Sequence, residues 1–217
     1  MRAAWLRGGP SCYAADARVR EHRRMWPQIA TVLTGDRVTL EPLRPEHADG
    51  LREAAADERI WTFMITTDVE RWLDDAYAEH EAGRRVQFAA LRVGSVVGST
   101  SYLSLAPEHL RLEIGNTWMH PSAWGTGANV EAKYLLLRHA FEPLGCRRVE
   151  FKTDARNERA RGALAALPAE FEGIHRKHMV VRGDERRDSA WYAVIDDDWP
   201  DVKAALERRL RATDRPN

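Results

Sequence analysis

Hydrophobic and polar positions change their period several times along the chain, and each change marks an expected element. Alternation of apolar and polar residues predicts strands at residues 37–43, 86–93, 96–105, 112–119, 147–152, 172–182 and 188–195. Apolar residues at helical spacing predict helices at residues 47–57, 69–82, 130–141 and 157–167, and a last one from Trp199 onward. Pro45 opens the first of these helices and Gly145 follows the third, in agreement with the limits given.

Strands and helices follow one another after Thr34 without an internal repeat or a break in composition. We therefore expect a single α/β (α+β) domain over residues 34–212 that ends in a C-terminal helix. Residues 1–33 contain Arg-rich and Ala-rich segments with no clear period, and we expect a poorly ordered N-terminal extension there. Two origins stay open for it: a basic tail, or a translation start placed ahead of the real one near Met25.

The Gly-rich turn after the strand at 112–119 is the most informative stretch of the chain. Gly125 and Gly127 let the backbone approach a ligand closely, and the helix that follows presents free N–H groups and the positive end of its dipole. Ala128 stands where a Walker A loop needs Lys, and Val130 stands where a dinucleotide fingerprint needs a small residue. A phosphate-bearing cofactor is one interpretation, and an ordinary strand-to-helix connection is the other.

Several ordered motifs around this turn decide between the two interpretations. Met119-His120-Pro121 ends the strand, and Ser122-Ala123-Trp124-Gly125-Thr126-Gly127 follows. This order is similar to the cofactor signature Gln/Arg-x-x-Gly-x-Gly/Ala of the GCN5-related N-acetyltransferases. The chain most closely resembles the branch that acetylates the N-termini of ribosomal proteins. Residues 149–164, 171–179 and 186–206 resemble later segments of that branch, so the resemblance covers roughly Thr34 to Leu210.

The resemblance implies a mixed, mostly antiparallel central sheet flanked by helices, with two strands splayed at the acyl-CoA site. It also implies transfer of an acetyl group from acetyl-CoA to a primary amine by direct attack, with acetyl-CoA or CoA bound as co-substrate and no metal. Backbone N–H groups at the strand end and in the turn would bind the acyl carbonyl, the pantetheine arm and the pyrophosphate. The cofactor-binding residues that follow are Trp118, Met119, His120, Trp124, Gly125, Thr126, Gly127, Ala128, Asn129 and Asn157.

Glu113 is the candidate catalytic base. Amine attack requires a neutral nitrogen, so a group must accept a proton at neutral pH. Members of the resembled family commonly carry a Glu near this place that acts through water. Alternation places Glu113 and Thr117 on one face of the strand, opposite Leu112, Ile114 and Trp118. A solvated or salt-bridged carboxylate on a half-exposed strand is the alternative interpretation of Glu113, and the imidazole of His120 is an alternative base.

Three departures from the family pattern support a second hypothesis. Ser122 replaces Gln or Arg, Ala160 replaces a Ser that can protonate the departing thiolate, and Pro168 replaces Gly. They favour a CoA-sensing or interaction module on the same fold, with weak or no catalysis. Asn157 has two compatible roles: it caps the helix that follows, and the resemblance implies that it bonds the pantetheine arm. An unrelated α/β domain is the third hypothesis.

Composition limits the partners. Lys and Arg total 33 and Asp and Glu total 33, which argues against a nucleic-acid binder. No apolar run reaches membrane-spanning length, and Cys12 and Cys146 fit no disulfide or metal spacing, so we expect a cytoplasmic protein. The acceptor is expected to be a small-molecule amine, a protein N-terminus or a lysine. Basic residues 175–178 favour an anionic acceptor or form an exposed hairpin edge, and a homodimer stays open.

Overall fold

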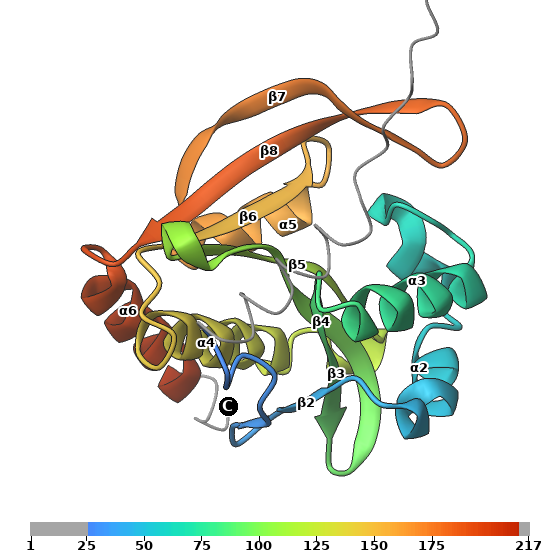
Figure 1. Ribbon diagram of the computed structural model, residues 1–217, viewed down its shortest axis with the longest axis horizontal. Helices are drawn as coiled ribbons and strands as arrows, with labels where there is room; N and C mark the ends of the chain where they lie inside the picture. Colours follow the sequence, from blue (N-terminus) through green and yellow to red (C-terminus); the bar gives the residue numbers. More distant parts are fainter. Residues whose placement is uncertain (1–25, 213–217) are drawn as a thin grey trace, which may run out of the picture.

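The computed structural model describes residues 26–212. Its strands are β1 (Leu33–Thr34), β2 (Thr39–Pro42), β3 (Val86–Arg92), β4 (Ser95–Ala106), β5 (Arg111–Met119), β6 (Arg148–Asp154), β7 (Glu170–Val181) and β8 (Glu185–Ile195). They form one 8-stranded sheet in the order β1-β2-β3-β4-β5-β6-β8-β7 (Figure 1). Only β5 and β6 pair in parallel within this sheet. The predicted mixed and mostly antiparallel sheet is confirmed.

The helices lie where the apolar periodicity placed them, with small shifts at their ends. The α-helices are α2 (Ala48–Ala54), α3 (Val69–Glu81), α4 (Ala128–Phe141), α5 (Glu158–Ala165) and α6 (Trp199–Ala212). Short 3₁₀ turns are η1 (Pro45–His47), η2 (Glu58–Phe63), η3 (Pro107–His109) and η4 (Pro121–Ala123). The sequence analysis missed β1 and η2, because two residues or one tight turn leave no readable period.

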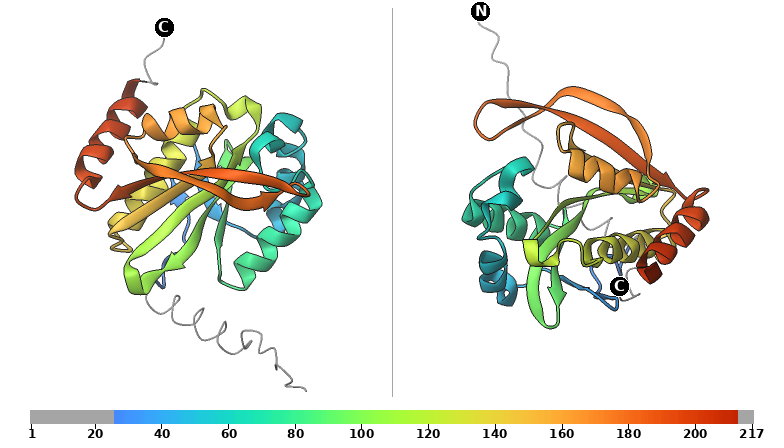
Figure 2. Two further views of the ribbon diagram at one scale, coloured as in Figure 1. Left: turned by 90° about the horizontal axis from the view of Figure 1, so that it is seen from above. Right: turned by 180° about the vertical axis from the view of Figure 1, so that it is seen from behind.

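Two hydrophobic cores lie on opposite faces of the sheet (Figures 1 and 2). The larger core joins α4, α5 and α6 to the sheet and contains Leu112, Ile114 and Phe151. We call this side the α4 face. The smaller core lies under α2, η2 and α3 and includes Trp61 and Trp118. We call this side the α3 face.

The ordered domain begins earlier than the sequence suggested. Trp26 and Ile29 are both part of the larger core, with 3% and 8% of their surface exposed. The indole Nε1 of Trp26 donates a hydrogen bond to the carbonyl of Leu144 at 2.8 Å. Residues 26–33, which the sequence analysis assigned to a poorly ordered extension, therefore belong to the fold. The rest of that expected extension, residues 1–25, lies outside the described residues.

The β7–β8 hairpin curves over the α3 face rather than continuing the plane of the sheet (Figure 2). At its tip, the backbone N–H of Arg182 donates to the carbonyl of Ile65 at 3.3 Å, and the Arg182 guanidinium donates to the carbonyl of Met64. Two register shifts in β7 allow the bend. The hairpin thus forms a roof between β6 and the loop that precedes α3.

Acid should weaken the larger core through one buried histidine. Nδ1 of His139 on α4 lies 3.1 Å from the Tyr102 hydroxyl, and the two groups share a hydrogen bond whose direction depends on the tautomer of the imidazole. Burial lowers the pKa of His139 to about 4, so the folded state keeps the imidazole neutral while the unfolded chain protonates below an ordinary pKa of about 6.5. The contribution of the neutral imidazole to the free energy of unfolding is fully present above pH ~6.5 and is lost as the pH falls toward ~4.

We expect the free energy of unfolding to be about 2 kcal/mol lower at pH ~5 than at pH ~7 because of this histidine. Urea unfolding at the two pH values measures the difference, and His139→Gln should remove most of it. An equal pH dependence in the variant would contradict this assignment of the acid sensitivity.

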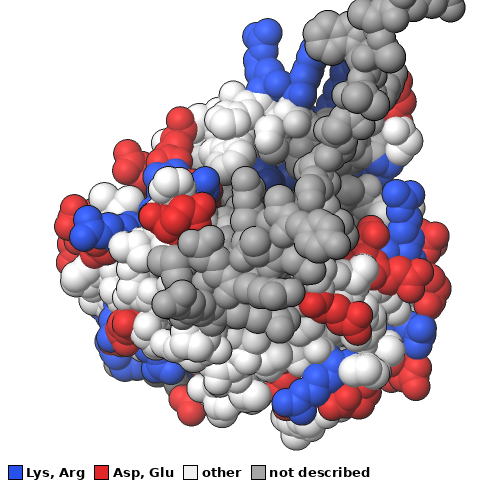
Figure 3. All heavy atoms as spheres, in the orientation of Figure 1, with Lys and Arg blue, Asp and Glu red and all other residues white. Residues whose placement is uncertain are grey.

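Charges of both signs are mixed over the surface. On the face shown in Figure 3, Lys and Arg alternate with Asp and Glu around the residues drawn in grey, and neither sign gathers into a patch. The pattern agrees with the equal totals in the sequence.

Candidate functional site

The strands β5 and β6 separate in the middle of the sheet and leave an opening. They pair only from Arg111 to Glu113, opposite residues 148–150 of β6. Beyond Glu113, the segment Ile114–Met119 has no strand partner on the β6 side among the described residues. Backbone N–H and C=O groups on a separated strand edge need other partners, because unpaired polar groups are costly when buried. The predicted splay is present, and Glu113 lies at its closed end.

A bulge in β5 corrects the predicted arrangement of its side chains. Asn116 has a φ of 49°, and the β4–β5 register shifts at this point. The extra residue reverses the alternation. Trp118 therefore packs on the α3 face, whereas Thr117 bonds to α4. The prediction that Glu113 shares a face with Thr117 and opposes Trp118 is wrong on both counts.

The bulge also determines which backbone donors face the splay. The N–H of His120 already donates to the Val97 carbonyl of β4 at 2.8 Å. Backbone N–H groups alternate between the two edges of a strand. The N–H of Trp118 therefore points toward β4, as that of His120 does, and the N–H groups of Thr117 and Met119 point toward the open edge. Of the three strand-end donors expected to bind the cofactor, only Met119 faces it. The sequence analysis did not include the N–H of Thr117 among the donors, because the bulge leaves no clear signal in the sequence.

The Gly-rich turn presents a run of free backbone donors. Gly125 and Gly127 adopt φ values of 73° and 83°, and α4 begins directly after them. Among the described residues, no acceptor is found for the N–H groups of residues 125–127, 129 and 130. A Cβ on Gly125 would point into open space, with nothing within 4 Å. A turn of this geometry concentrates N–H donors at a helix start and can bind an anion.

Other residues of the turn serve mainly to shape it. The Trp124 N–H donates to Pro121 O at 3.0 Å, so Trp124 offers no backbone donor to a ligand. Its indole Nε1 donates to the Met119 carbonyl at 2.8 Å. Thr126 Oγ1 donates to the Ala123 carbonyl at 2.8 Å and lies 3.4 Å from the Ala128 nitrogen. These bonds tie the strand end to the helix start and hold the free donors in place.

The imidazole of His120 is also hydrogen-bonded within the turn. Its Nδ1 accepts from the Ser122 backbone N–H at 3.2 Å and lies 2.8 Å from the Ser122 hydroxyl. The alternative base considered for this chain therefore acts as the cap of η4 in this structure.

Asn157 and three arginines line a pocket at the mouth of the splay. Asn157 Oδ1 accepts from the Ala160 N–H at 3.0 Å, which confirms its role as the N-cap of α5. No acceptor in the described chain takes the Asn157 side-chain NH₂ group. The pocket has a volume of about 330 Å³ and is bounded by η2 and the start of α5. Guanidinium groups of Arg59 and Arg159 lie 5.3 and 4.1 Å from the ring centroid of Trp124.

The arginines near α5 differ in what they contact. Arg156 pairs with Asp154 and Glu185, and Arg161 donates to Tyr192 and to a backbone carbonyl. Arg159 forms no ion pair with any described residue and contacts only the Trp124 ring. Arg159 is thus the available cation beside the turn, which periodicity alone cannot single out.

Glu113 is buried at the closed end of the splay, with 1% of its surface exposed. Its Oε2 accepts from Ser104 Oγ at 3.1 Å and lies 3.2 Å from the ammonium of Lys152. Of the alternative interpretation of Glu113, the salt bridge is present, to Lys152, whereas the solvated and half-exposed position is not. Its Oε1 has no hydrogen-bond donor in the described part of the chain, so one carboxylate oxygen can accept a proton or a water.

The β7–β8 hairpin adds basic and aromatic groups on the same side. The rings of His175 and His178 lie 4.9 and 5.6 Å from that of Trp191, and Lys152 lies 5.2 Å from it. Partial burial, followed by the charge of Lys152, lowers the pKa of His178. All four residues of the basic segment expected to wall the acceptor are exposed, and the two histidine rings lie against Trp191.

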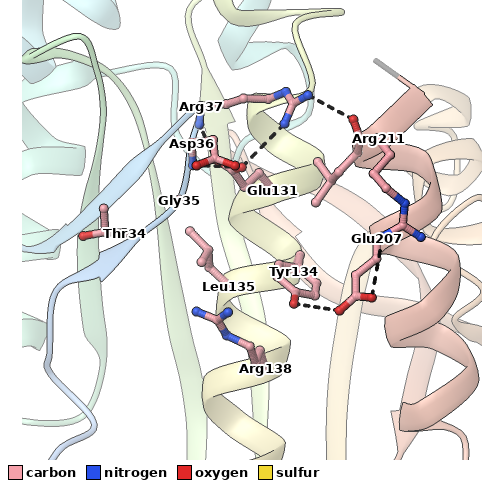
Figure 4. A pocket seen from close by; sticks show the side chains of 11 residues that line it. Thr34, Gly35, Asp36, Arg37, Glu131, Tyr134, Leu135, Arg138, Glu207 and Arg211 are labelled. Atoms are coloured by element: carbon pink, nitrogen blue, oxygen red, sulfur yellow. Dashed lines mark hydrogen bonds and ion pairs between the residues drawn. The ribbon is translucent and has the colours of Figure 1, made fainter. Parts of the chain in front are cut away.

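A second pocket, of about 310 Å³, lies away from the splay between α4, α6 and the β1–β2 turn (Figure 4). Its carboxylates are already used: Glu131 accepts from three backbone N–H groups of residues 36–38, and Glu207 accepts from the Tyr134 hydroxyl. Cys146 is also structural, since it is buried and burial raises the pKa of its thiol to about 12. Neither feature belongs to the candidate site.

Comparison with known proteins agrees with this geometry. Residues 37–169 match the model of the acetyltransferase (GNAT) domain family. The chain is similar to a putative acetyltransferase of T. thermophilus, at 39% identity over 82% of this chain and 96% of that one, with a TM-score of 0.75. It is also similar to a GCN5-related N-acetyltransferase of Brucella melitensis, at 30% identity over 82% and 85% of the two chains and a TM-score of 0.77. No match was found among curated proteins.

The fold extends to more distant structures. Mycobacterium smegmatis RimJ, solved in complex with CoA-disulfide, shares 23% identity over 84% of this chain and 95% of that one, with a TM-score of 0.70. The chain thus belongs to the GNAT acetyltransferase family, whose co-substrate is acetyl-CoA, and shares its fold with RimJ. Within residues 26–212, no helix is both long and apolar enough to cross a bilayer, and no cluster of metal-ligating side chains is found.

Proposed function

We propose that this acetyltransferase moves an acetyl group from acetyl-CoA to a primary amine by direct attack. The observation that carries the proposal is the splayed β5–β6 edge, which opens at its mouth onto the free N–H groups of residues 125–127, 129 and 130. One end of this site suits a pyrophosphate, and its narrow part suits an extended arm that bonds to a strand edge.

The residues present fit CoA. N–H groups of the turn and of the first turn of α4 would hold the pyrophosphate, with Arg159 beside them. The Asn157 NH₂ group would donate to a carbonyl of the pantetheine arm. Met119 and Thr117 would offer their N–H groups from the strand edge. Trp118 and His120, whose N–H groups face β4, would contribute shape rather than hydrogen bonds.

Glu113 would serve as the base. Its free carboxylate oxygen faces the α3 face, and there the acceptor would enter under the β7–β8 hairpin. A water between Glu113 and the amine would carry the proton, which lets a buried carboxylate act at a distance. Strand N–H groups would stabilise the oxyanion that forms as the amine attacks. Lys152 would keep the buried charge of Glu113 compensated throughout.

The surroundings of Glu113 favour an acceptor that carries a negative charge near its amine. Lys152, His175 and His178 line this side, and Arg187 acts on the same groups electrostatically. A small-molecule amine with an acidic group and an acidic protein N-terminus both meet this requirement. The CoA-sensing module remains the second candidate, since Ala160 offers no hydroxyl to the leaving thiolate.

Release of free thiol from acetyl-CoA tests the proposal. The purified protein should release thiol only when a primary amine is present, and faster with acidic amines than with neutral ones of equal length. Thiol release with hydroxyl or thiol acceptors alone would contradict amine transfer. Binding of acetyl-CoA without turnover for any of the amine, hydroxyl and thiol acceptors would favour the sensing module.

Arg159→Ala should weaken binding of acetyl-CoA about fivefold, which corresponds to about 1 kcal/mol for one partly screened phosphate contact. Calorimetry at low and high salt measures the effect, and the difference should shrink as salt rises. Arg138→Ala is the matched control, because Arg138 stacks on Tyr134 in the pocket of Figure 4. Equal affinities for the wild-type protein and Arg159→Ala would place the phosphates elsewhere.

A further inference from the structure

Lys133 is a positively charged side chain inside the splay that the function proposed above does not use. It lies on α4, past the Gly-rich turn, and is only partly accessible. Its Nζ donates to Thr117 Oγ1 on β5 at 2.7 Å. The same nitrogen lies 5.9 Å from the ring centroid of Phe151 on β6. Lys133 therefore spans the two strands beneath the gap between them.

No negative group within residues 26–212 compensates this ammonium. No carboxylate there pairs with it, and the neighbouring Glu131 is turned toward residues 36–38 on the other side of α4. On α6, Glu207 accepts from Tyr134 instead. Burial is the sole cause that lowers the pKa of Lys133 to about 7, and no facing charge from β5, β6, α4 or α6 contributes. A desolvated and uncompensated cation is costly unless something else pairs with it.

The position of Lys133 identifies what that partner is. Thr117 holds the ammonium and belongs to the β5 segment whose N–H groups face the open edge. An acyl carbonyl bound to those N–H groups places its sulfur within the same narrow part of the splay. When the carbon–sulfur bond breaks, the negative charge appears there. Ala160, by contrast, has no proton to give.

We propose that Lys133 is the proton donor to the departing CoA thiolate. This inference rests on the acetyl transfer proposed above. As the tetrahedral intermediate collapses, the carbon–sulfur bond breaks and its electron pair goes to sulfur. An N–H proton of the Lys133 ammonium then passes to the thiolate and leaves a neutral amine on Lys133. The proton that Glu113 takes from the acceptor amine goes to solvent, and solvent reprotonates Lys133.

The group is well matched to this task. A CoA thiol titrates near an ordinary thiol pKa of about 8.5, while an unperturbed lysine, near 10.4, would hold its proton too tightly. Burial brings the pKa of Lys133 below that of the thiol, so transfer to the thiolate is favourable. Thr117 accepts a hydrogen bond from the ammonium and fixes its direction.

The first test observes the thiol of CoA bound to the wild-type protein, by ultraviolet absorbance of the thiolate during a pH titration. Because burial lowers the pKa of Lys133 to about 7, its amine is already neutral where the thiol titrates, so the thiol bound to the wild-type protein should titrate no lower than free CoA. In Lys133→Arg, whose charge is permanent, the bound thiol should titrate about one pH unit lower than in the wild-type protein. CoA lacking sulfur gives the background signal. A wild-type thiol that titrates below free CoA would mean that the ammonium keeps its proton beside the thiolate, and equal titrations in the two proteins would place the sulfur away from residue 133; either result would overturn the proposal.

The second test is Lys133→Met, which keeps the length and apolar stem of the side chain. We expect kcat to fall about 30-fold while the dissociation constant of acetyl-CoA changes by less than about threefold, because only a step after binding is affected. Lys203→Met is the matched control, since Lys203 pairs with Glu142 on α6, and it should leave kcat unchanged.

The outcomes separate the two proposals. Failure of the wild-type protein to bind any CoA species would remove both. Normal binding and turnover in Lys133→Met would remove only the role of Lys133. If Lys133→Met does not fold, Lys133→Arg replaces it. Arginine keeps the charge but holds its proton, so kcat should fall although acetyl-CoA still binds.

Discussion

Gly125→Val raises the dissociation constant of acetyl-CoA about 100-fold, or about 2.7 kcal/mol, if the Gly-rich turn is the pyrophosphate site. Two causes act together. A Cβ on Gly125 points into the open space where the phosphates would lie, and the φ of 73° strains any β-branched residue. The free N–H groups of the turn then move away from their acceptors. Calorimetric titration with acetyl-CoA measures the loss.

Gly94→Val separates the two causes. Gly94 has a φ of 80°, and a Cβ there also meets nothing within 4 Å. It lies in the β3–β4 hairpin, outside the candidate site. The two variants should lose similar stability in thermal unfolding, but only Gly125→Val should lose affinity. A comparable loss of affinity in both would mean that general destabilisation, and not the turn, accounts for the result.

Glu113→Gln should lower kcat about 100-fold and leave the affinity for acetyl-CoA close to that of the wild-type protein. The amide keeps the size of the side chain but cannot accept the proton of the attacking amine. The ratio of wild-type to variant rates should fall as the pH rises, because a larger share of the acceptor is then already neutral. Steady-state thiol release across a pH series measures both effects.

The control for this variant is Glu150→Gln. Glu150 pairs with Glu113 in the β5–β6 register and is held by Arg111 and Arg148. Its substitution should cost some stability and little turnover. A Glu113→Gln protein with an unchanged rate at every pH would exclude Glu113 from proton transfer. His178 would then be the next candidate for the base.

Sequence reasoning reached the outline of the fold because strong periods and turn residues define most elements. The strand at 112–119, the Gly-rich turn and the helix after it were all predicted, and the splay followed from the family resemblance. The bulge at Asn116 was not predicted: Asn is uncommon in strands and tolerates a positive φ, but one Asn inside an alternating segment does not by itself place a reversal of alternation. That one residue changes which side chains and which N–H groups face the ligand.

The candidate site was predicted unevenly for the same kind of reason. Asn157 as a helix cap depends on local spacing and was correct. His120 and Trp124 were expected to offer backbone donors, but both N–H groups are used within the fold. Such pairings depend on contacts between elements. The isolation of Lys133 likewise appears only once β5, β6 and α4 have come together.

Calorimetric titration of the purified protein with acetyl-CoA, with CoA and ATP as controls, tests the central claim most directly. The account predicts micromolar or tighter binding of acetyl-CoA and CoA, and much weaker binding of ATP, which shares the phosphates but lacks the arm that fits the splay. Equal binding of ATP would reduce the site to a general anion turn. No binding of either CoA species would contradict the assignment of the splay as the acyl-CoA site.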